Sequence, residues 1–189
     1  MNSHGNNKIE NLNIRYNLVP ISIGVLFNLA PTFSFWLTGH GKLIELIVFL
    51  LVSSIPAFLT NSFVDKLQIS ENTNLYKTMG VDRFKKYAAS GDLINHQIRK
   101  KYPKFRQLMS NRSMEIYLLE TYKSEKIHYV LLLFCFFTSA SALLNNVIFL
   151  LILIMSSNLL FNVYPIFLQQ SNRLRIKMYL KKKTNRNSE

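Results

Sequence analysis

The sequence is poor in the residues from which many catalytic sites are built. Its 189 residues contain one cysteine, six glycines and four histidines. The lone thiol, Cys135, lies in an apolar run, with no partner for an internal disulfide and no neighbouring base to activate it. The polar segment in the middle of the chain has no glycine-rich phosphate-binding motif. That absence argues against a nucleotide or cofactor pocket in this segment, as a methyltransferase or a reductase would need.

Histidines are also too few for a metal centre. Glu125 and His128 form a Glu-x-x-His pair, the helical motif of di-iron carboxylate bundles. Such bundles need a second pair and further glutamates, and His4, His40 and His96 have no partner at that spacing. We therefore expect no metal site and no bound cofactor.

Acidic residues are scarce, because 10 Asp and Glu stand against 23 Lys and Arg, for a net charge of +13. A basic protein of this size can indicate a nucleic-acid partner. Here the positive charge lies between or after long apolar blocks, and the preference of cytoplasmic loops for Lys and Arg explains it. We therefore expect an all-α integral membrane protein and no nucleic-acid partner.

The first apolar blocks predict one transmembrane hairpin. No charge occurs between Arg15 and Lys42, which predicts a helix at about 17–38, kinked or broken near Pro31. The charge-free run 46–64 predicts a second span, in which one proline is tolerated as a kink.

The last apolar block predicts a second hairpin. Apart from His128, the 46 residues between Lys126 and Arg173 are uncharged, too many for one span and enough for two. A turn at Asn145 and Asn146 would join helices at about 128–144 and 147–168.

These four spans divide the chain into five segments. They are a polar N-terminal arm at 1–16, the first hairpin at 17–64, a basic helical loop at 65–127, the second hairpin at 128–172 and a basic tail at 173–189. The positive-inside preference then places the loop and both termini on the cytoplasmic side of a multi-pass cell-membrane protein.

The loop has 13 Lys and Arg against 7 Asp and Glu, and its pattern predicts helices at 74–87, with Gly80 as a weak point, at 92–101 and at 110–126. Basic and aromatic residues alternate at 98–109, which fits either contact with anionic membrane lipids or a solvated basic loop.

Two sets of residues are candidates for a functional site. Glu125 and His128 lie three residues apart, on one face of a helix as it enters the membrane. A histidine oriented by a carboxylate can remove a proton from a hydroxyl. The alternative is an interfacial histidine beside a surface glutamate.

The second set lies near the end of the last span. Asn158 and Asn162 are one helical turn apart, and Gln169, Asn172, Arg173 and Arg175 follow near the cytoplasmic face. The asparagines suit either a site or helix–helix hydrogen bonds. The arginines suit either phosphate binding or anchoring at the membrane surface.

Three blocks of this sequence resemble the glycosyl-4,4'-diaponeurosporenoate acyltransferase family. They are Gly80–Lys85, Tyr117–His128 with its glutamates, and Asn162–Arg175 with its asparagine, proline and closing arginines. Gln170 and Ser171 stand where the family turn has Arg-Tyr, and Ala88-Ala89 where it has Leu-Pro.

The resemblance implies transfer of a fatty acyl group to a hydroxyl of a membrane-embedded glycolipid or carotenoid glycoside. His128 would take the hydroxyl proton, and Glu125 would orient the His128 imidazole. The remaining candidates would bind substrates, with the arginines on the phosphate of an acyl donor such as an acyl thioester; they are Glu120, Asn158, Asn162, Gln169, Asn172, Arg173 and Arg175. The alternative is a non-catalytic membrane anchor or assembly protein.

Overall fold

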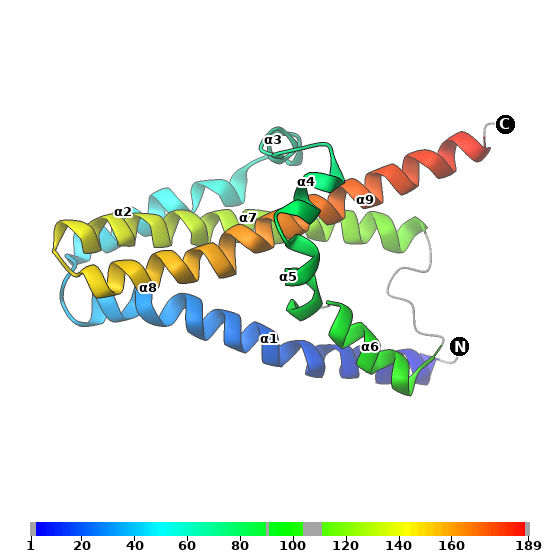
Figure 1. The fold of residues 1–189 in the computed structure, drawn as a ribbon, viewed down its shortest axis with the longest axis horizontal. Coiled ribbons are helices and arrows are strands. Elements are labelled where there is room, and N and C mark those ends of the chain that lie inside the picture. The colour runs from blue at the N-terminus through cyan, green and yellow to red at the C-terminus, as the bar shows by residue number, and fades with distance from the viewer. Residues whose placement is uncertain (1–2, 90, 104–110, 188–189) are drawn as a thin grey trace.

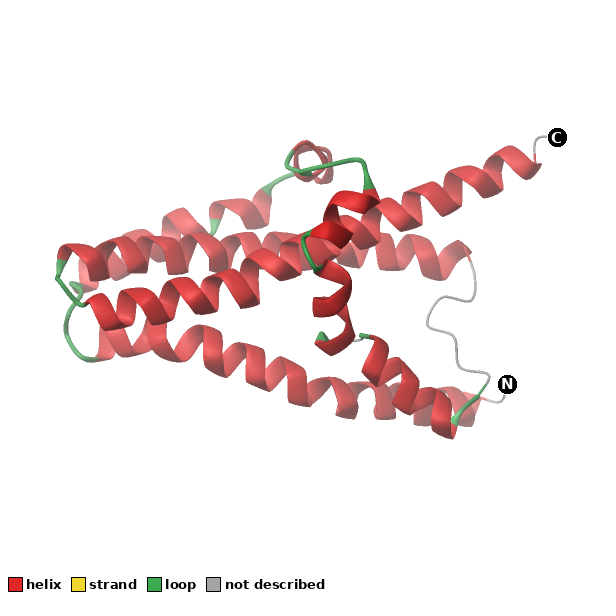
Figure 2. Cartoon of the chain, viewed as in Figure 1, coloured by secondary structure: helices red, strands yellow, loops and turns green. Residues whose placement is uncertain are grey.

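The computed structural model describes residues 3–89, 91–103 and 111–187, and within these ranges it is helical with no strands (Figures 1 and 2). The elements in order are α1 Ser3–Leu37, α2 Leu43–Ser53, the 3-10 turn η1 Ile55–Phe58, α3 Asn61–Lys66, α4 Thr73–Thr78, α5 Val81–Tyr87, α6 Asp92–Lys101, α7 Asn111–Leu144, α8 Ile148–Asn158, the π turn η2 Leu159–Val163 and α9 Tyr164–Asn187.

Three of these helices are long and apolar enough to cross a bilayer. They are Asn11–Leu37, Met114–Leu144 and the continuous helix Ile148–Asn185. The expected all-α class is therefore confirmed for the described residues, and three helices are candidates for membrane spans. The expected number of four spans is not confirmed, because the remaining apolar helix, Leu43–Phe58, is shorter than a typical span.

Pro56 accounts for this shorter helix. It lies in the 3-10 turn η1, and the chain then becomes extended at Leu59 and Thr60. The Thr60 hydroxyl accepts a hydrogen bond from the Phe63 N–H at 3.2 Å and caps α3. The helix that was expected over 46–64 is thus divided into three pieces.

The first helix differs from expectation in two ways. It begins at Ser3, inside the stretch expected as an arm, and it continues through Pro31 where a kink or break was expected. Proline removes only one backbone hydrogen bond, and within a membrane helix nearby polar groups compensate for it. The carbonyl freed by Pro31 is that of Phe27, and the neighbouring Asn28 carbonyl accepts an additional bond from the Thr32 hydroxyl at 3.2 Å.

Two predicted breaks are confirmed by the backbone. Asn146 has a φ of 58°, and the Val147 N–H donates to the Ala142 carbonyl at 2.9 Å, which ends α7 in a tight left-handed turn. Gly80, with a φ of 81°, separates α4 from α5. The helix predicted at 92–101 is α6, and the one predicted at 110–126 is the first part of α7.

Figure 1 shows how the helices are arranged. The α1–α2 and α7–α8 turns lie at one end of the bundle, and both chain ends lie at the other. α7 packs against α2, α8 and α9, while α1 packs against α8 and α6. Residues 104–110 lie outside the described ranges, as does that part of the expected lipid-contact segment 98–109.

The short helices cover the bundle at the end where the chain termini lie. Tyr76 of α4 and Val81 of α5 form an apolar cluster with Leu168 and Leu174 of α9. Ile94 and Ile98 of α6 pack against Tyr16 of α1 and Tyr102.

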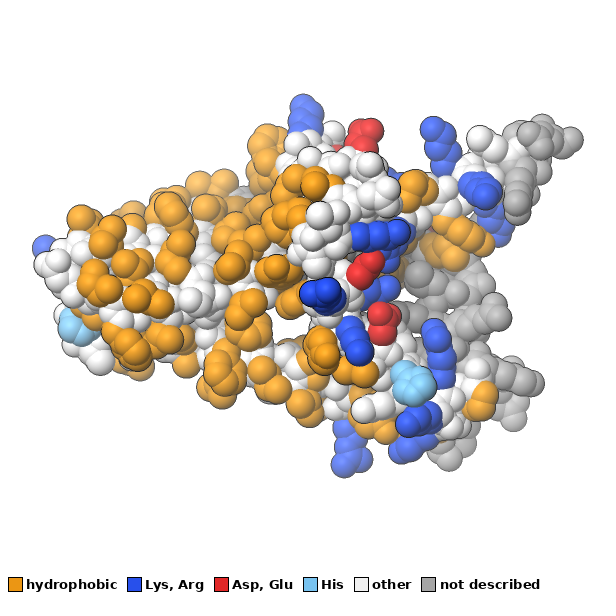
Figure 3. Space-filling model, viewed as in Figure 1, with side chains coloured by type: hydrophobic (Ala, Val, Ile, Leu, Met, Phe, Trp, Pro, Cys, Tyr) orange, Lys and Arg blue, Asp and Glu red, His pale blue; other side chains and the backbone are white. Residues whose placement is uncertain are grey.

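The outer surface divides into two regions. Exposed apolar side chains cover the half of the bundle at the turn end, and Lys and Arg gather over the short helices and α9 (Figure 3). Apolar residues such as Leu37 and Phe58 are each 84% exposed. Such a surface suits lipid around one half and water around the other.

Candidate functional site

The last helix carries the candidate site, and its geometry begins at the π turn η2. Pro165 has no backbone N–H, so a regular α-helical hydrogen bond is missing at this point. The wider turn over Leu159–Val163 absorbs the irregularity, and the helix resumes at Tyr164. The turn fixes the rotation of every α9 side chain that follows.

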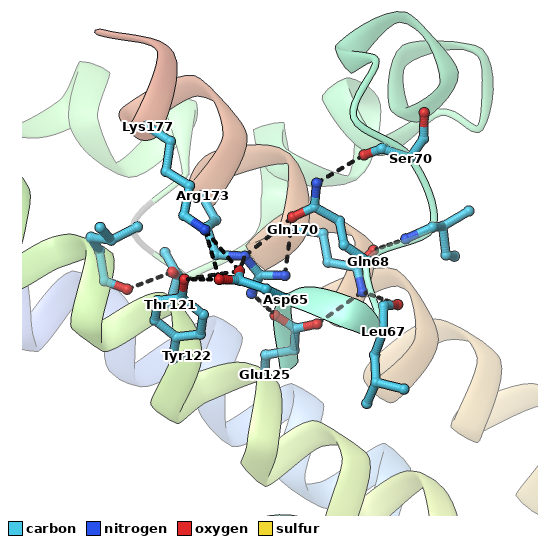
Figure 4. Close-up of polar contacts among 12 residues, drawn as sticks. Asp65, Leu67, Gln68, Ser70, Thr121, Tyr122, Glu125, Gln170, Arg173 and Lys177 are labelled. Atoms are coloured by element: carbon cyan, nitrogen blue, oxygen red, sulfur yellow. Dashed lines mark hydrogen bonds and ion pairs between the residues drawn. The ribbon is translucent and has the colours of Figure 1, made fainter. Parts of the chain in front are cut away.

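One face of α9 carries Gln170, Arg173 and Lys177, which repeat at helical spacing. Arg173 is fully buried and forms an ion pair through Nη1 with the equally buried Glu125 of α7. Its Nε lies 3.2 Å from Asp65 Oδ1. This face is therefore fixed to α7 and α3 (Figure 4).

Two further groups complete the surroundings of Arg173. Its Nη2 donates to Gln68 Oε1 at 3.2 Å, and its guanidinium carbon lies 4.8 Å from the centre of the Tyr122 ring. A buried charge costs little only when such partners satisfy it. Because Arg173 is also fully buried, its guanidinium is not accessible to a substrate.

Gln170 joins four parts of the chain. Its Nε2 donates to Glu125 Oε1 at 2.8 Å and to the Leu67 carbonyl at 3.3 Å. Its Oε1 accepts from the Tyr76 hydroxyl at 3.0 Å and from the Ile69 N–H at 3.2 Å. Burial raises the pKa of the Tyr76 phenol, so this hydroxyl remains protonated and can donate at neutral pH.

Asp65 closes the network at the protein surface. Its carboxylate accepts from the Tyr122 hydroxyl at 2.9 Å and from Lys177 Nζ at 2.8 Å (Figure 4). We call the nine residues of this cluster the buried network; they are Asp65, Gln68, Tyr76, Tyr122, Glu125, Tyr129, Gln170, Arg173 and Lys177. Of these, only Glu125 and Arg173 were predicted from the sequence.

The opposite face of α9 lines a cavity of about 290 Å³. Three predicted residues, Gln169, Asn172 and Arg175, contribute to its wall. The other lining residues come from α5, α6, the segment between them, α7 and α9; they are Lys85, Ala89, Gly91, Asp92, Asn95, Arg99, Tyr117, Leu168 and Ile176. Adjacent polar residues of α9 thus lie on different faces of the helix. Gln170 and Arg173 bond to α7, whereas Gln169 and Asn172 line the cavity.

In the described parts of the chain no hydrogen bond or ion pair joins His128 to Glu125. The carboxylate of Glu125 is taken up by Arg173 and Gln170. The imidazole instead lies beside the Asn162 side chain and the Phe161 carbonyl, and its Nδ1 is buried without a hydrogen-bond partner. The structure therefore gives Glu125 other partners than His128, and a role of this carboxylate in orienting the imidazole stays a prediction.

The two predicted asparagines lie in a second polar cluster between α1, α7 and α8. Asn158 donates to the Leu132 carbonyl at 3.2 Å, and Asn162 donates to Asn158 Oδ1 at 2.8 Å. Asn162 and Asn28 also exchange amide hydrogen bonds of 3.1 and 3.3 Å. The bonds to Leu132 and Asn28 are helix–helix bonds of the kind that the sequence allowed as the alternative. Asn28 was missed, although an amide in an otherwise apolar span is itself a signal.

Glu120 lies apart from both clusters. It is exposed and forms an ion pair with Lys123 at 2.8 Å, one turn further along α7. Within the described ranges no three His, Cys, Asp or Glu side chains lie close enough together to hold a metal ion.

Comparison with known proteins gives one result. The family model described as glycosyl-4,4'-diaponeurosporenoate acyltransferase matches residues 60–182. No curated protein and no solved structure matches this chain. The matched range runs from the start of α3 into α9, so it includes the buried network and the whole cavity wall but leaves out α1 and α2.

Proposed function

The chain belongs to the glycosyl-4,4'-diaponeurosporenoate acyltransferase family, and on this premise we propose that it transfers a fatty acyl group to a hydroxyl of a membrane-embedded glycolipid or carotenoid glycoside. The reaction takes place at the cytoplasmic face of the cell membrane. The basic loop, the tail and both termini lie on that side, with Leu43–Phe58 as a fourth, shorter crossing.

The observation that carries this proposal is the position of the cavity. Measured along α7 from Leu144, Glu125 lies about 28 Å away, close to the thickness of a bilayer core of about 30 Å. The buried network therefore marks the membrane boundary, and the cavity on the other face of α9 opens at the same level. A cavity at this level suits substrates with one polar end and a long apolar chain.

His128 has the position expected for the general base. It lies about 24 Å from Leu144 along the helix, just inside the bilayer core. Its neighbour Asn162 precedes Gln169 of the cavity wall by seven residues, or about 10 Å along the axis. An acyl donor whose polar end occupies the cavity can therefore extend its acyl carbonyl toward His128.

The chemistry follows from these positions. His128 accepts the proton of the acceptor hydroxyl, whose oxygen attacks the acyl carbon. A new ester C–O bond forms as the bond to the leaving group breaks, and the leaving group takes the proton from the imidazolium. Asn162 and the Phe161 carbonyl orient the ring in place of Glu125. Glu125 is then a positioning residue, which holds α9 through Arg173.

The test is His128→Ala in the full-length protein, assayed with a glycosylated carotenoid and an acyl thioester in detergent micelles. We expect kcat to fall by about 100-fold or more, the usual contribution of a general base. The matched control is His96→Ala, because His96 is exposed on α6 and does not line the cavity.

Two outcomes would contradict the proposal. Undiminished transfer by a folded His128→Ala protein would show that the base is another group. Absence of transfer by the natural protein, together with loss of a bound partner when the loop is removed, would favour the anchor or assembly protein.

A further inference from the structure

We propose that the cavity beside α9 binds a phosphate group of the acyl donor through Lys85, Arg99 and Arg175. This inference rests on the proposed acyl transfer, because it names the chemical class of the donor. The loop residues Lys85 and Arg99 were not among the sequence candidates. They come from α5, which packs against α9, and from α6, which packs against α5 and lines the same cavity.

The charge of the cavity wall favours an anion. Its ionisable side chains, tyrosine apart, are three cations and one carboxylate, Asp92. Lys85 lies 3.7 Å from Asp92, and Arg175 donates to Asp82 at 2.8 Å. Both pairs are partly exposed and therefore weak, so a phosphate can displace them.

Arg99 is the cation most available to a ligand. Its side chain is exposed, and it forms no ion pair with any residue in the described ranges. A guanidinium can hold two phosphate oxygens at once through parallel N–H donors. Arg99 is therefore the residue whose loss should affect a phosphate ligand most.

Neutral donors surround the cations. The amides of Gln169 and Asn172 line the wall, and the Asn172 Nδ2 lies 3.5 Å from the Tyr117 hydroxyl. A phosphate has several acceptor oxygens and needs donors on more than one side. The side chains of the wall provide them from α6, α7 and α9.

The absence of a side chain at Gly91 allows α5 and α6 to approach closely. A Cβ at this position would lie 2.1 Å from the Lys85 carbonyl oxygen and 2.6 Å from that of Ala88. Only glycine allows α6 to begin this close to α5, which brings Lys85 and Arg99 to one cavity.

The size of the cavity indicates which part of a donor it holds. At about 290 Å³ it is at the small end of ligand sites. It can enclose a polar phosphate-bearing group, and the acyl chain must lie outside it. Figure 3 shows that the surface is hollowed between α1 and the α5–α6 segment, beside the apolar half where such a chain would be solvated by lipid.

The experiment measures binding to the full-length protein in maltoside micelles, which contain no phosphate. The probes are palmitoyl-coenzyme A, phosphatidylglycerol and palmitoyl-N-acetylcysteamine, a thioester without phosphate. The variant is Arg99→Gln. Its control is Lys100→Gln, which removes the same charge from the next position of α6 but does not line the cavity.

We expect Arg99→Gln to weaken binding of a phosphate-bearing probe about 10-fold or more, and Lys100→Gln to change it less than about twofold. The phosphate-free thioester should bind weakly and equally to all three proteins. The Arg99→Gln substitution should weaken binding of one of the two phosphate-bearing probes more than the other. The probe that loses more affinity, palmitoyl-coenzyme A or phosphatidylglycerol, identifies the source of the phosphate. Labelling of the buried Cys135 by a maleimide dye checks that each variant is folded.

Equal binding of phosphate-bearing and phosphate-free probes would overturn the inference, as would equal effects of the Arg99 and Lys100 substitutions. The measurement does not need turnover. If Arg99-dependent binding is found but no acyl transfer occurs, the phosphate subsite is supported and the proposed function fails. If transfer occurs with a phosphate-free donor and does not depend on Arg99, the proposed function is supported and the subsite is wrong.

Discussion

Breaking the ion pair between Glu125 and Arg173 should strongly destabilise the protein. Both side chains are fully buried, and Arg173→Met leaves the Glu125 carboxylate with only neutral partners. Removal of one member of a buried pair costs about 3–5 kcal/mol. Domains are stable by only about 5–15 kcal/mol, so this is a large fraction of the total.

The opposite substitution should cost less. In Glu125→Leu, Arg173 keeps Asp65 at 3.2 Å and Gln68 at 3.2 Å. We expect a loss of about 2–3 kcal/mol, mainly from the partly satisfied guanidinium. The double variant removes both charges, and since apolar replacement of a whole buried pair is often close to neutral, it should lie within about 2 kcal/mol of the natural protein.

The protein contains its own reporter for the measurement. Cys135 is the only cysteine, and it is buried in the bundle. Its labelling by a maleimide dye during unfolding in SDS therefore follows opening of the helices without any added probe. The four proteins give a double-mutant cycle with an expected coupling energy of at least about 3 kcal/mol.

Simple additivity of the two substitutions would refute this reasoning, as would an unchanged unfolding midpoint for Arg173→Met. The same proteins test the role of Glu125. A double variant that is stable and still transfers acyl groups supports a positioning role. One that is stable but inactive would show that Glu125 or Arg173 takes part in the chemistry.

Two further substitutions test the surroundings of the site. Asn28→Leu removes the amide exchange with Asn162, and it should destabilise the protein by about 1 kcal/mol in the Cys135 assay. The control Thr38→Val removes only hydrogen bonds to carbonyls of the same exposed helix end, which water can replace, so its effect should be much smaller. Gly91→Ala should weaken palmitoyl-coenzyme A binding about 10-fold, because its Cβ would displace α6 from α5. In Gly24→Ala the new Cβ lies at an ordinary 3.5 Å from Phe161, so binding should remain unchanged.

The sequence predicted features that depend on local chemistry. The helix expected at 92–101, before Pro103, is α6, and the breaks at Gly80 and Asn146 need residues that tolerate a positive φ. Such signals lie within a few residues of the element that they define. They were therefore accessible without knowledge of the fold.

The partner of Glu125 could not be found in this way. His128 lies one turn along the same helix, whereas Arg173 is 48 positions away and meets Glu125 only when α9 packs on α7. A buried carboxylate requires a positive or hydrogen-bonding partner far more strongly than an exposed one does. The burial of Glu125 therefore decides which residue becomes its partner, and this burial depends on the tertiary fold.

The division of α9 into two faces gives the physical reason for placing substrate in the cavity. Successive helical residues point about 100° apart, so Gln170 and Arg173 face α7 while Gln169 and Asn172 face the cavity. On the first face Gln170 and Arg173 are fully buried and bonded to neighbouring helices, so a ligand does not reach them. On the second face they line an open space. The π turn at Leu159–Val163 sets this rotation, because one residue fewer there would turn Arg173 about 100° away from Glu125. The irregular turn, the buried pair and the cavity are therefore parts of one arrangement, in which the fixed face of α9 holds the other in position for a substrate.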